Sequence, residues 1–188
     1  MAAPLKPGNW YYVITGASGA GKSTLIAALR ELGYATVPET ANTILREQRK
    51  LGGTLLPATD RKAFMQAVFE RSVADFERAA TYAGPVFFDR AIPEWLRFLG
   101  WKQAACQQAL AKYRYAAKVF VAQPWAEIYQ RDDERVHHFD QAVASYPPTV
   151  SAYTDAGYQV CSLPQQPVAE RVTFVLNEVA ADAGRHGS

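Results

Sequence analysis

Cysteine is scarce in this chain of 188 residues, which contains only Cys106 and Cys161. The two lie far apart in the sequence and form no Cys-x-x-Cys pair, so we expect two reduced thiols in a cytoplasmic protein rather than a disulfide or a metal site. A strong charge of one sign is also missing, because the net charge is only +2. The whole chain therefore gives no reason to expect binding to nucleic acid or to an anionic membrane, and any anion must bind at a local site.

Long hydrophobic runs are absent as well. No segment reaches the roughly 18 consecutive apolar residues that a membrane helix needs, and residues 1–9 have no apolar core of the kind found in a signal peptide. The sequence shows no internal repeat. The composition, 49% hydrophobic and 20% charged, is typical of a globular protein. We expect a single domain over residues 1–188 with a buried core and a disordered polar tail at about 183–188.

Short apolar runs are what the chain does have, and five of them predict strands. Several are continuous rather than alternating, as in parallel strands that are covered on both faces. Helical patterns separate the runs, which favours an α/β fold with a parallel sheet and right-handed crossovers. Pro38 places the second strand at a sheet edge, because proline cannot donate to a neighbouring strand. The predicted strands are Tyr11–Thr15, Ala35–Pro38, Pro85–Phe88, Lys118–Ala122 and Gln159–Leu163.

Three helices are indicated by apolar residues that recur on one face. The first follows a predicted cap at Thr59 and has an apolar face of Met65, Phe69, Val73, Phe76 and Ala80. The second begins near Pro93 and stops at Gly100. The third runs from about Pro167 to Ala181.

A glycine-rich stretch, GASGAGKST, joins the first predicted strand to an apolar helical pattern. It fits the pattern G-x-x-x-x-G-K-[ST] with Gly16, Gly21, Lys22 and Ser23. Backbone N–H groups must turn inward around phosphate oxygens, and glycines allow this because they lack a Cβ and adopt positive φ angles. The following helix points its unsatisfied N–H groups at the same phosphates. The residues predicted to bind ATP are Gly16, Ala17, Ser18, Gly19, Ala20, Gly21, Lys22, Ser23 and Thr24.

Within this loop two side chains have predicted roles. Lys22 should bridge the β- and γ-phosphates, and the Ser23 hydroxyl should ligate Mg²⁺. The alternative, a glycine-rich turn that matches by chance, is expected on the order of once in a few hundred chains of this size. A dinucleotide-binding fingerprint fits worse, because Thr24 stands where its third glycine would be.

Several classes of P-loop protein are excluded by missing motifs. A GTPase would have Asp-x-x-Gly and Asn-Lys-x-Asp, but Asp89 is followed by Arg-Ala-Ile and the second motif is absent. The Leu-Ser-Gly-Gly-Gln signature of transporter ATPases is absent too. A ring-forming mechanoenzyme usually has an Asp-Glu pair where this chain has Asp89-Arg90. ATP is preferred over GTP only because no guanine-reading motif is found.

The remaining motifs resemble those of small-molecule P-loop kinases. The nearest are nucleoside and nucleotide kinases, including nicotinamide riboside kinase domains of the NadR type, and above all a family of predicted P-loop ATPases related to them. The similarity covers about residues 10–178 and rests on VPET, FFDR, PWAEIYQRDDER and GYQVCSLP. It implies a three-layer α/β/α sandwich around a five-stranded parallel sheet in the order 2-3-1-4-5. Members often have an arginine near Asn42, so an anion contact on that helix is missing here or is supplied by Arg46.

That strand order suggests roles for three residues at the carboxyl ends of strands, where ligands bind in such sheets. Asp89 would end the strand beside the glycine loop and hold Mg²⁺ through water. Glu39 would end the next strand, about 5 Å further out, and take a proton from the acceptor hydroxyl. For both, a helix-capping carboxylate is the alternative. Arg90 would either clamp an acceptor phosphate or pair with a carboxylate.

A lid is predicted at about residues 124–147. In related kinases this segment carries arginines that offset charge on the transferring phosphoryl group. Arg131 and Arg135 are the candidates, with a solvated charged turn as the alternative. His137 and His138 are expected at the surface. The aromatic side chains of Trp95, Trp101, Trp125 and Tyr153 are expected mainly in the core, with a place in the lining of an acceptor pocket as the alternative for one of them. Backbone groups of residues 163–166 would hold the adenine.

Our leading hypothesis from the sequence is an Mg²⁺- and ATP-dependent kinase. Its acceptor would be a nucleoside, a nucleotide or a cofactor precursor, and this choice rests on the resemblance alone. The rival hypothesis is a nucleotide-gated binding protein that hydrolyses ATP or GTP slowly and recruits a partner. We expect a small-molecule acceptor as the binding partner, no nucleic acid and no membrane, with a homodimer as a candidate assembly.

Overall fold

The computed structural model describes residues 10–129 and 139–186 and contains a five-stranded parallel sheet in the order β2-β3-β1-β4-β5. This order confirms the fold class expected from the sequence, with β2 at an edge and β1 at the centre. The strands are β1 (Tyr11–Gly16), β2 (Ala35–Val37), β3 (Val86–Asp89), β4 (Lys118–Ala122) and β5 (Gln159–Ser162). Each lies within one residue of its predicted bounds at either end, and β4 has the predicted bounds.

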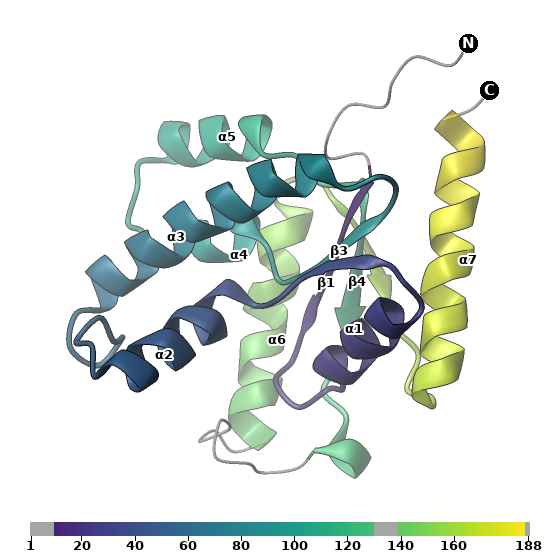
Figure 1. Cartoon of the computed structure of the whole chain (residues 1–188), viewed down its shortest axis with the longest axis horizontal. Coiled ribbons are helices and arrows are strands. Elements are labelled where there is room, and N and C mark those ends of the chain that lie inside the picture. Colours follow the sequence, from purple (N-terminus) through teal and green to yellow (C-terminus); the bar gives the residue numbers. More distant parts are fainter. Residues whose placement is uncertain (1–9, 130–138, 187–188) are drawn as a thin grey trace.

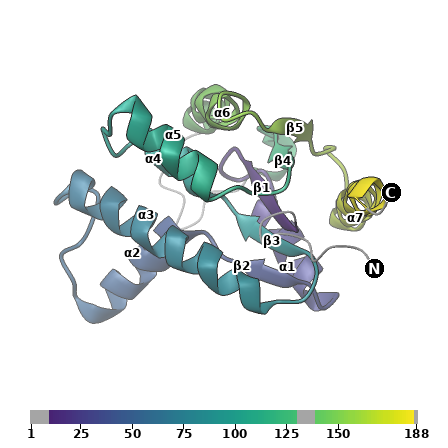
Figure 2. The ribbon, with the colours of Figure 1, turned by 90° about the horizontal axis from the view of Figure 1, so that it is seen from above.

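Helices cover both faces of the sheet (Figure 1). Figure 2 shows α1 and α7 on one side of the strands and α3 to α6 on the other. The helices are α1 (Lys22–Glu31), α2 (Thr40–Leu51), α3 (Arg61–Arg78), α4 (Ile92–Leu96), α5 (Gln103–Lys112), α6 (Phe139–Thr154) and α7 (Val168–His186), with 3₁₀ turns η1 (Ala79–Thr81) and η2 (Ala126–Ile128).

Strand β1 connects the two halves of the hydrophobic core. Tyr11 and Val13 pack into the cluster under α2 to α6, whereas Tyr12 and Ile14 pack into the cluster under α1 and α7. Successive side chains of a strand point to opposite faces, so a continuous apolar run fills both layers. All six residues of β1 are buried. The loop that follows β1 is therefore anchored on the most central element of the fold.

Helix boundaries differ from the prediction at four places. The side chain that caps α3 belongs to Asp60, which accepts from the backbone N–H of Ala63 at 2.9 Å, and not to Thr59. Ala80 is exposed in η1 rather than part of the apolar face of α3. Helix α4 ends at Leu96, and a turn continues the chain to residue 100. Helix α7 reaches His186, so residues 183–186 are helical where we expected a disordered tail.

Two further expectations concern the chain as a whole. Cys106 and Cys161 are both free thiols. Among the helices of the described residues, none combines the length and the apolar character that crossing a membrane requires.

Candidate functional site

The glycine loop begins where β1 ends and lies against the end of β4. Gly16 has a φ of +119°, and a Cβ there would lie 2.1 Å from the carbonyl oxygen of Ala122. The next N–H, that of Ala17, donates to the same oxygen at 2.9 Å. No side chain larger than glycine fits between the two strands at this point, so the first glycine of the motif is required by packing as well as by its φ angle.

The later glycines are crowded by side chains from distant segments. A Cβ on Gly19 would lie 2.5 Å from the ring of Tyr129, and one on Gly21 would lie 2.7 Å from Nη1 of Arg171. Gly21 also precedes α1 in a left-handed conformation, and no side chain caps that helix. The first N–H groups of α1 are therefore not satisfied by a capping side chain, which is the arrangement that binds phosphate at a helix N-terminus.

Lys22 turns back onto the loop. Its Nζ donates to the carbonyl oxygens of Ala17, at 2.6 Å, and Gly16, at 3.2 Å. The side chain is buried. Burial lowers the pKa of Lys22 to about 8, repulsion from Arg90 adds to this effect, and three nearby carboxylates oppose it. A buried ammonium group held only by carbonyl oxygens is well placed to exchange them for phosphate oxygens.

Asp89 ends β3 beside the loop and is buried. Within the described part of the chain, its Oδ1 has no hydrogen-bond partner. Burial raises the pKa of Asp89 to about 6, although the charge of Lys22 opposes the change. Buried carboxylate oxygens are normally paired, so this atom fits a partner that arrives with a ligand, such as a metal-bound water. Ser23, the other predicted Mg²⁺ ligand, is exposed in the first turn of α1.

The state of Asp89 leads to a first prediction, that Asp89→Asn stabilises the ligand-free protein at pH 7. A carboxyl with a raised folded-state pKa contributes stability that is fully present below its ordinary pKa of 3.8 and is lost as the pH rises through about 6. Asparagine mimics the protonated form. We expect a gain of about 1–3 kcal/mol at pH 7, shrinking to nothing near pH 4. Thermal melts followed by circular dichroism at several pH values measure it.

The matched control for this prediction is Asp155→Asn, because Asp155 is exposed. That variant should melt with the wild type at every pH. An Asp89→Asn variant that is less stable than the wild type at pH 7 would contradict the prediction.

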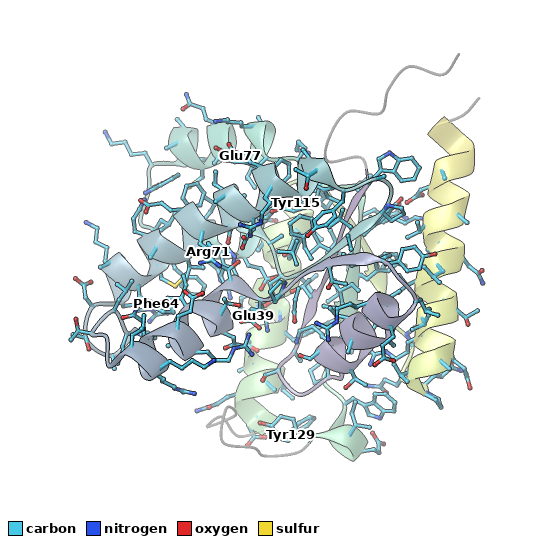
Figure 3. The ribbon with its side chains drawn as sticks, in the orientation of Figure 1. Glu39, Phe64, Arg71, Glu77, Tyr115 and Tyr129 are labelled. Atoms are coloured by element: carbon cyan, nitrogen blue, oxygen red, sulfur yellow. The ribbon has the colours of Figure 1, made fainter. Side chains whose placement is uncertain are left out.

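Glu39 and Arg90 meet just beyond the carboxyl ends of β2 and β3, which are neighbouring strands. Glu39 occupies the N-cap position of α2, but its side chain does not cap that helix. Its Oε2 instead accepts from Nδ2 of Asn42 at 3.0 Å and lies 3.4 Å from Nε of Arg90. Figure 3 shows Glu39 where β2 leads into α2. Arg46 is exposed on the same helix, and its Nη2 is 3.5 Å from the hydroxyl of Thr43.

Arg90 is held by three groups of the protein. Besides the contact with Glu39, its Nη1 lies 2.6 Å from Oε2 of Glu94, and its Nη2 donates to the carbonyl oxygen of Gly16 at 3.0 Å. Of the two alternatives that the sequence left open, pairing with a carboxylate is the one seen here. Glu94 itself was not singled out by the sequence. Its side chain is almost fully buried. The sequence does not indicate this burial, because a glutamate in the first turn of a helix is usually exposed.

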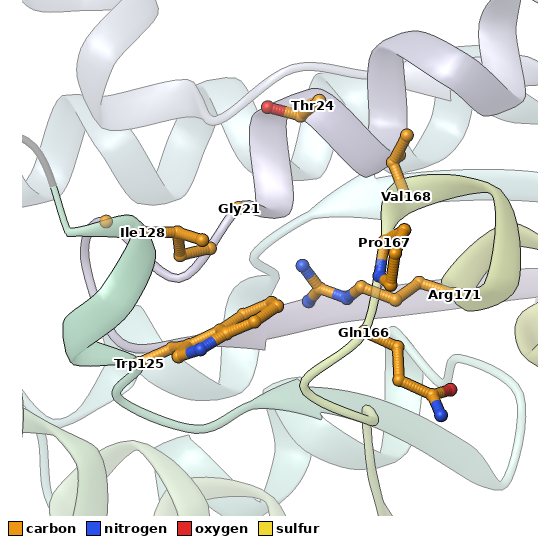
Figure 4. Close-up of a pocket in the computed structure, with 9 residues that line it drawn as sticks. Gly21, Thr24, Trp125, Ile128, Gln166, Pro167, Val168 and Arg171 are labelled. Carbon is orange, nitrogen blue, oxygen red and sulfur yellow. The ribbon is translucent and has the colours of Figure 1, made fainter.

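A pocket of about 330 Å³ opens beside the glycine loop (Figure 4). It is bounded by the loop, by the segment around η2 and by the start of α7. Trp125 lines this pocket and is half-buried, so it has the pocket position that was the alternative for one of these aromatic residues, whereas Trp95 and Tyr153 belong to the core. The pocket is lined by Gly19, Gly21, Thr24, Trp125, Ile128, Gln166, Pro167, Val168 and Arg171.

Arg171 is the second residue of the site that sequence reasoning missed. Its guanidinium extends from α7 toward Trp125 and Gly21 (Figure 4), and Nη1 donates to the carbonyl oxygen of Ala20 at 3.0 Å. The side chain is buried, and its Nε has no hydrogen-bond partner among the described residues. Burial lowers its pKa. The sequence did contain a signal for this residue. Arg171 is next to Val172 in α7, beside an apolar stripe that also includes Val175.

Some predicted residues lie outside the described part of the chain. These are Arg131 and Arg135, the predicted lid arginines, and His137 and His138. Among the residues that the structure does describe, no three histidine, cysteine, aspartate or glutamate side chains gather as a metal-binding cluster.

Comparison with solved structures finds many small-molecule kinases. The deoxyadenosine kinase of M. mycoides matches with a TM-score of 0.61 and 16% identity, covering 91% of this chain and 99% of that one. Shikimate kinase from Acinetobacter baumannii gives a TM-score of 0.57 at 16% identity, covering 94% and 96%. Thymidylate kinase from Ehrlichia chaffeensis gives 0.54 at 16% identity, covering 93% and 100%. At this identity the likeness establishes the fold.

Comparison by sequence gives two results. No curated protein sequence matches the chain. A family model described as an AAA domain matches residues 11–171, from the start of β1 to the buried arginine of α7. The glycine loop, the strand order and this match agree, and the chain belongs to the AAA domain family with the fold of the P-loop nucleotide and small-molecule kinases.

Proposed function

We propose that this protein is an ATP-dependent kinase that transfers the γ-phosphate to a hydroxyl- or phosphate-bearing small molecule in the presence of Mg²⁺. One observation carries the proposal. Lys22 follows β1 and the glycine loop, Asp89 ends β3, and Glu39 lies just beyond β2, so the three groups stand at the carboxyl ends of neighbouring strands. Within the described part of the chain, Oδ1 of Asp89 has no hydrogen-bond partner. These groups supply a phosphate ligand, a metal ligand and a proton acceptor at one edge of the sheet.

The nucleotide has a natural place at this edge. Its phosphates would lie on the glycine loop, and its base would enter the pocket between Trp125 and residues 166–168. Arg171 is the cation at that pocket, and its Nε, which has no hydrogen-bond partner in the part of the chain that the structure describes, favours a ligand with an acceptor atom. A solved structure of the M. mycoides deoxyadenosine kinase contains dATP, which supports a nucleotide in the corresponding fold.

The chemistry follows from the charges of this chain. Lys22 would exchange the carbonyl oxygens of Ala17 and Gly16 for phosphate oxygens. Glu39 would accept the proton of an acceptor hydroxyl as that oxygen attacks the γ-phosphorus, while the bond from the γ-phosphorus to the bridging oxygen breaks and ADP leaves with that oxygen. Ser23 and Asp89 would hold Mg²⁺, which, when bound, neutralises charge on the phosphate oxygens. Arg131 and Arg135 remain the candidates for closing over the site.

Single-turnover transfer of labelled γ-phosphate to a panel of acceptors tests the proposal. The panel should contain nucleosides, nucleotides and polyhydroxylated acids, so that both hydroxyl and phosphate acceptors are present. Label in at least one acceptor is the expected result. Hydrolysis to inorganic phosphate with no labelled acceptor would contradict the kinase and favour the nucleotide-gated binding protein.

A second prediction concerns the base pocket. Trp125→Ala should weaken binding of ATP about 5- to 100-fold, because stacking on an aromatic ring contributes roughly 1–3 kcal/mol per base. Binding of inorganic triphosphate should be unchanged, since it occupies only the loop. Calorimetric titration of both ligands measures the difference, and Trp125→Phe, which keeps an aromatic face, serves as the control. An equal loss for ATP and triphosphate would show that Trp125 does not contact the base.

A further inference from the structure

Glu94 is the most deeply buried carboxylate of the site. Its side chain is 1% exposed and receives three hydrogen bonds. Two donors are neutral, the hydroxyl of Thr15 on β1 and the hydroxyl of Tyr153 on α6, the latter at 2.7 Å. The third is Nη1 of Arg90 at 2.6 Å. A buried charge is kept only when it is paired and hydrogen-bonded, and here three separate elements satisfy one carboxylate.

The tyrosine of this cluster is a fixed donor. Tyr153 is completely buried, and its pKa is raised well above the ordinary value by burial and then by the charge of Glu94. Its hydroxyl therefore stays protonated near neutral pH and donates to Glu94. Its hydrogen bond to Glu94 joins α6 to α4, two elements that lie far apart in the sequence.

Arg90 is where this cluster meets the proposed reaction. It is the one residue other than glycine with a positive φ, 61°, in the described part of the chain. Such a backbone conformation is unfavourable and persists only where the surroundings impose it. The guanidinium joins Glu94 and Glu39, and it also donates to Gly16 in the nucleotide loop.

The two carboxylates hold Arg90 unequally. Glu94 is the nearer, at 2.6 Å, and its side chain is 1% exposed, whereas Glu39 is at 3.4 Å with a side chain that is 20% exposed. Glu94 is thus the anchor, and Glu39 is the member of the pair that an acceptor can reach. If Glu94 lost its charge, Glu39 would be the one remaining carboxylate that pairs with Arg90. The guanidinium would then move toward Glu39 and away from the carbonyl oxygen of Gly16.

We propose that Glu94 is a positioning residue that seats Arg90 on the nucleotide loop and shares its charge, so that the carboxylate of Glu39 stays available to the acceptor. Thr15 and Tyr153 fix the carboxylate of Glu94. The proposal rests on the proposed function, because it assigns a purpose to the placement of Glu39.

A double-mutant cycle of Glu39→Gln and Glu94→Gln tests it. Glu94→Gln should lower kcat for phosphoryl transfer about 10- to 100-fold, as expected for a misplaced catalytic group, while KM for ATP changes less than about threefold. In the Glu39→Gln background the second substitution should have no further effect, because Glu94 acts through Glu39. Effects that multiply would overturn the proposal.

Matched controls separate positioning from folding. Asp75 is also buried and lies 3.5 Å from Nε of Arg71, but on α3 and outside the site. Asp75→Asn should lower the melting temperature and leave the effect of Glu39→Gln unchanged. Tyr153→Phe, with Tyr158→Phe as its control, loosens Glu94 without removing its charge and should lower kcat in the same direction as Glu94→Gln. If Asp75→Asn abolished the effect of Glu39→Gln on kcat, as Glu94→Gln is expected to do, the proposed positioning role of Glu94 would be contradicted.

A readout that needs no activity completes the test. A crystal structure of Glu94→Gln should show Nη2 of Arg90 away from the carbonyl oxygen of Gly16 and the guanidinium closer to Glu39. An unchanged Arg90 would overturn the proposal whatever the protein catalyses. If Glu39→Gln alone leaves transfer intact, the proposed role of Glu39 fails, and the crystal structure still decides whether Glu94 holds Arg90.

Discussion

Glu39→Gln is expected to lower the rate of phosphoryl transfer about 10²- to 10⁴-fold, the range that general-base catalysis contributes. Glutamine keeps the shape of the side chain but cannot take up the acceptor proton. The dissociation constant for ATP should change less than about threefold, because the contacts of Glu39 run to Asn42 and Arg90 rather than to the nucleotide loop. Single-turnover transfer and calorimetric titration give the two quantities separately.

Glu47 provides the matched control for this prediction. It lies on the same helix, is exposed, and pairs with Arg71 at 3.6 Å. Glu47→Gln should transfer phosphate at the wild-type rate. If Glu39→Gln also did so, the base would have to be another group. If Glu39→Gln left a basal hydrolysis rate unchanged and no acceptor were ever labelled, the nucleotide-gated binding protein would be the better account.

Lys22→Met should lower kcat by about 10²- to 10³-fold, comparable to removing one preorganised donor from a transition-state site. Among the described residues, the ammonium is the side-chain cation that follows the loop directly and is buried against it. Binding of ATP should weaken as well. Rapid-quench transfer and calorimetric titration measure both effects.

Lys112→Met is the control for Lys22, because Lys112 lies in the last turn of α5, away from the loop. It should leave both quantities at their wild-type values. A Lys22→Met variant with wild-type kcat would mean that the amine seen against Gly16 and Ala17 is a structural contact of the loop and nothing more.

The fold was predictable because its signals are local. Continuous apolar runs mark the strands, and Pro38 marks the sheet edge, since each reflects the environment of its own segment. The glycine loop was predictable for the same reason. The ends of helices were harder to predict. Thr59 and Asp60 are adjacent and both can cap a helix, and only the structure shows which side chain accepts the hydrogen bond from the N–H of Ala63.

The parts of the site that the sequence did not predict depend on tertiary contacts. Glu94 is buried at the site because Thr15 and Tyr153, which are distant in the sequence, converge on it. Arg171 reaches a loop that lies at the other end of the chain. Trp125 has the apolar character of a core residue, and whether it faces the core or a pocket is set by how η2 packs against the loop.

The proposed function requires that the backbone N–H groups of residues 16–24 and the amine of Lys22 bind a polyphosphate. Isothermal titration of the wild-type protein with Mg·ATP, repeated with inorganic triphosphate, measures this directly. We predict saturable heat for both ligands at a stoichiometry of one per chain, and weaker binding of both in Lys22→Met. If neither Mg·ATP nor triphosphate gave binding heat, the proposed function and the role assigned to Glu94 would both be contradicted.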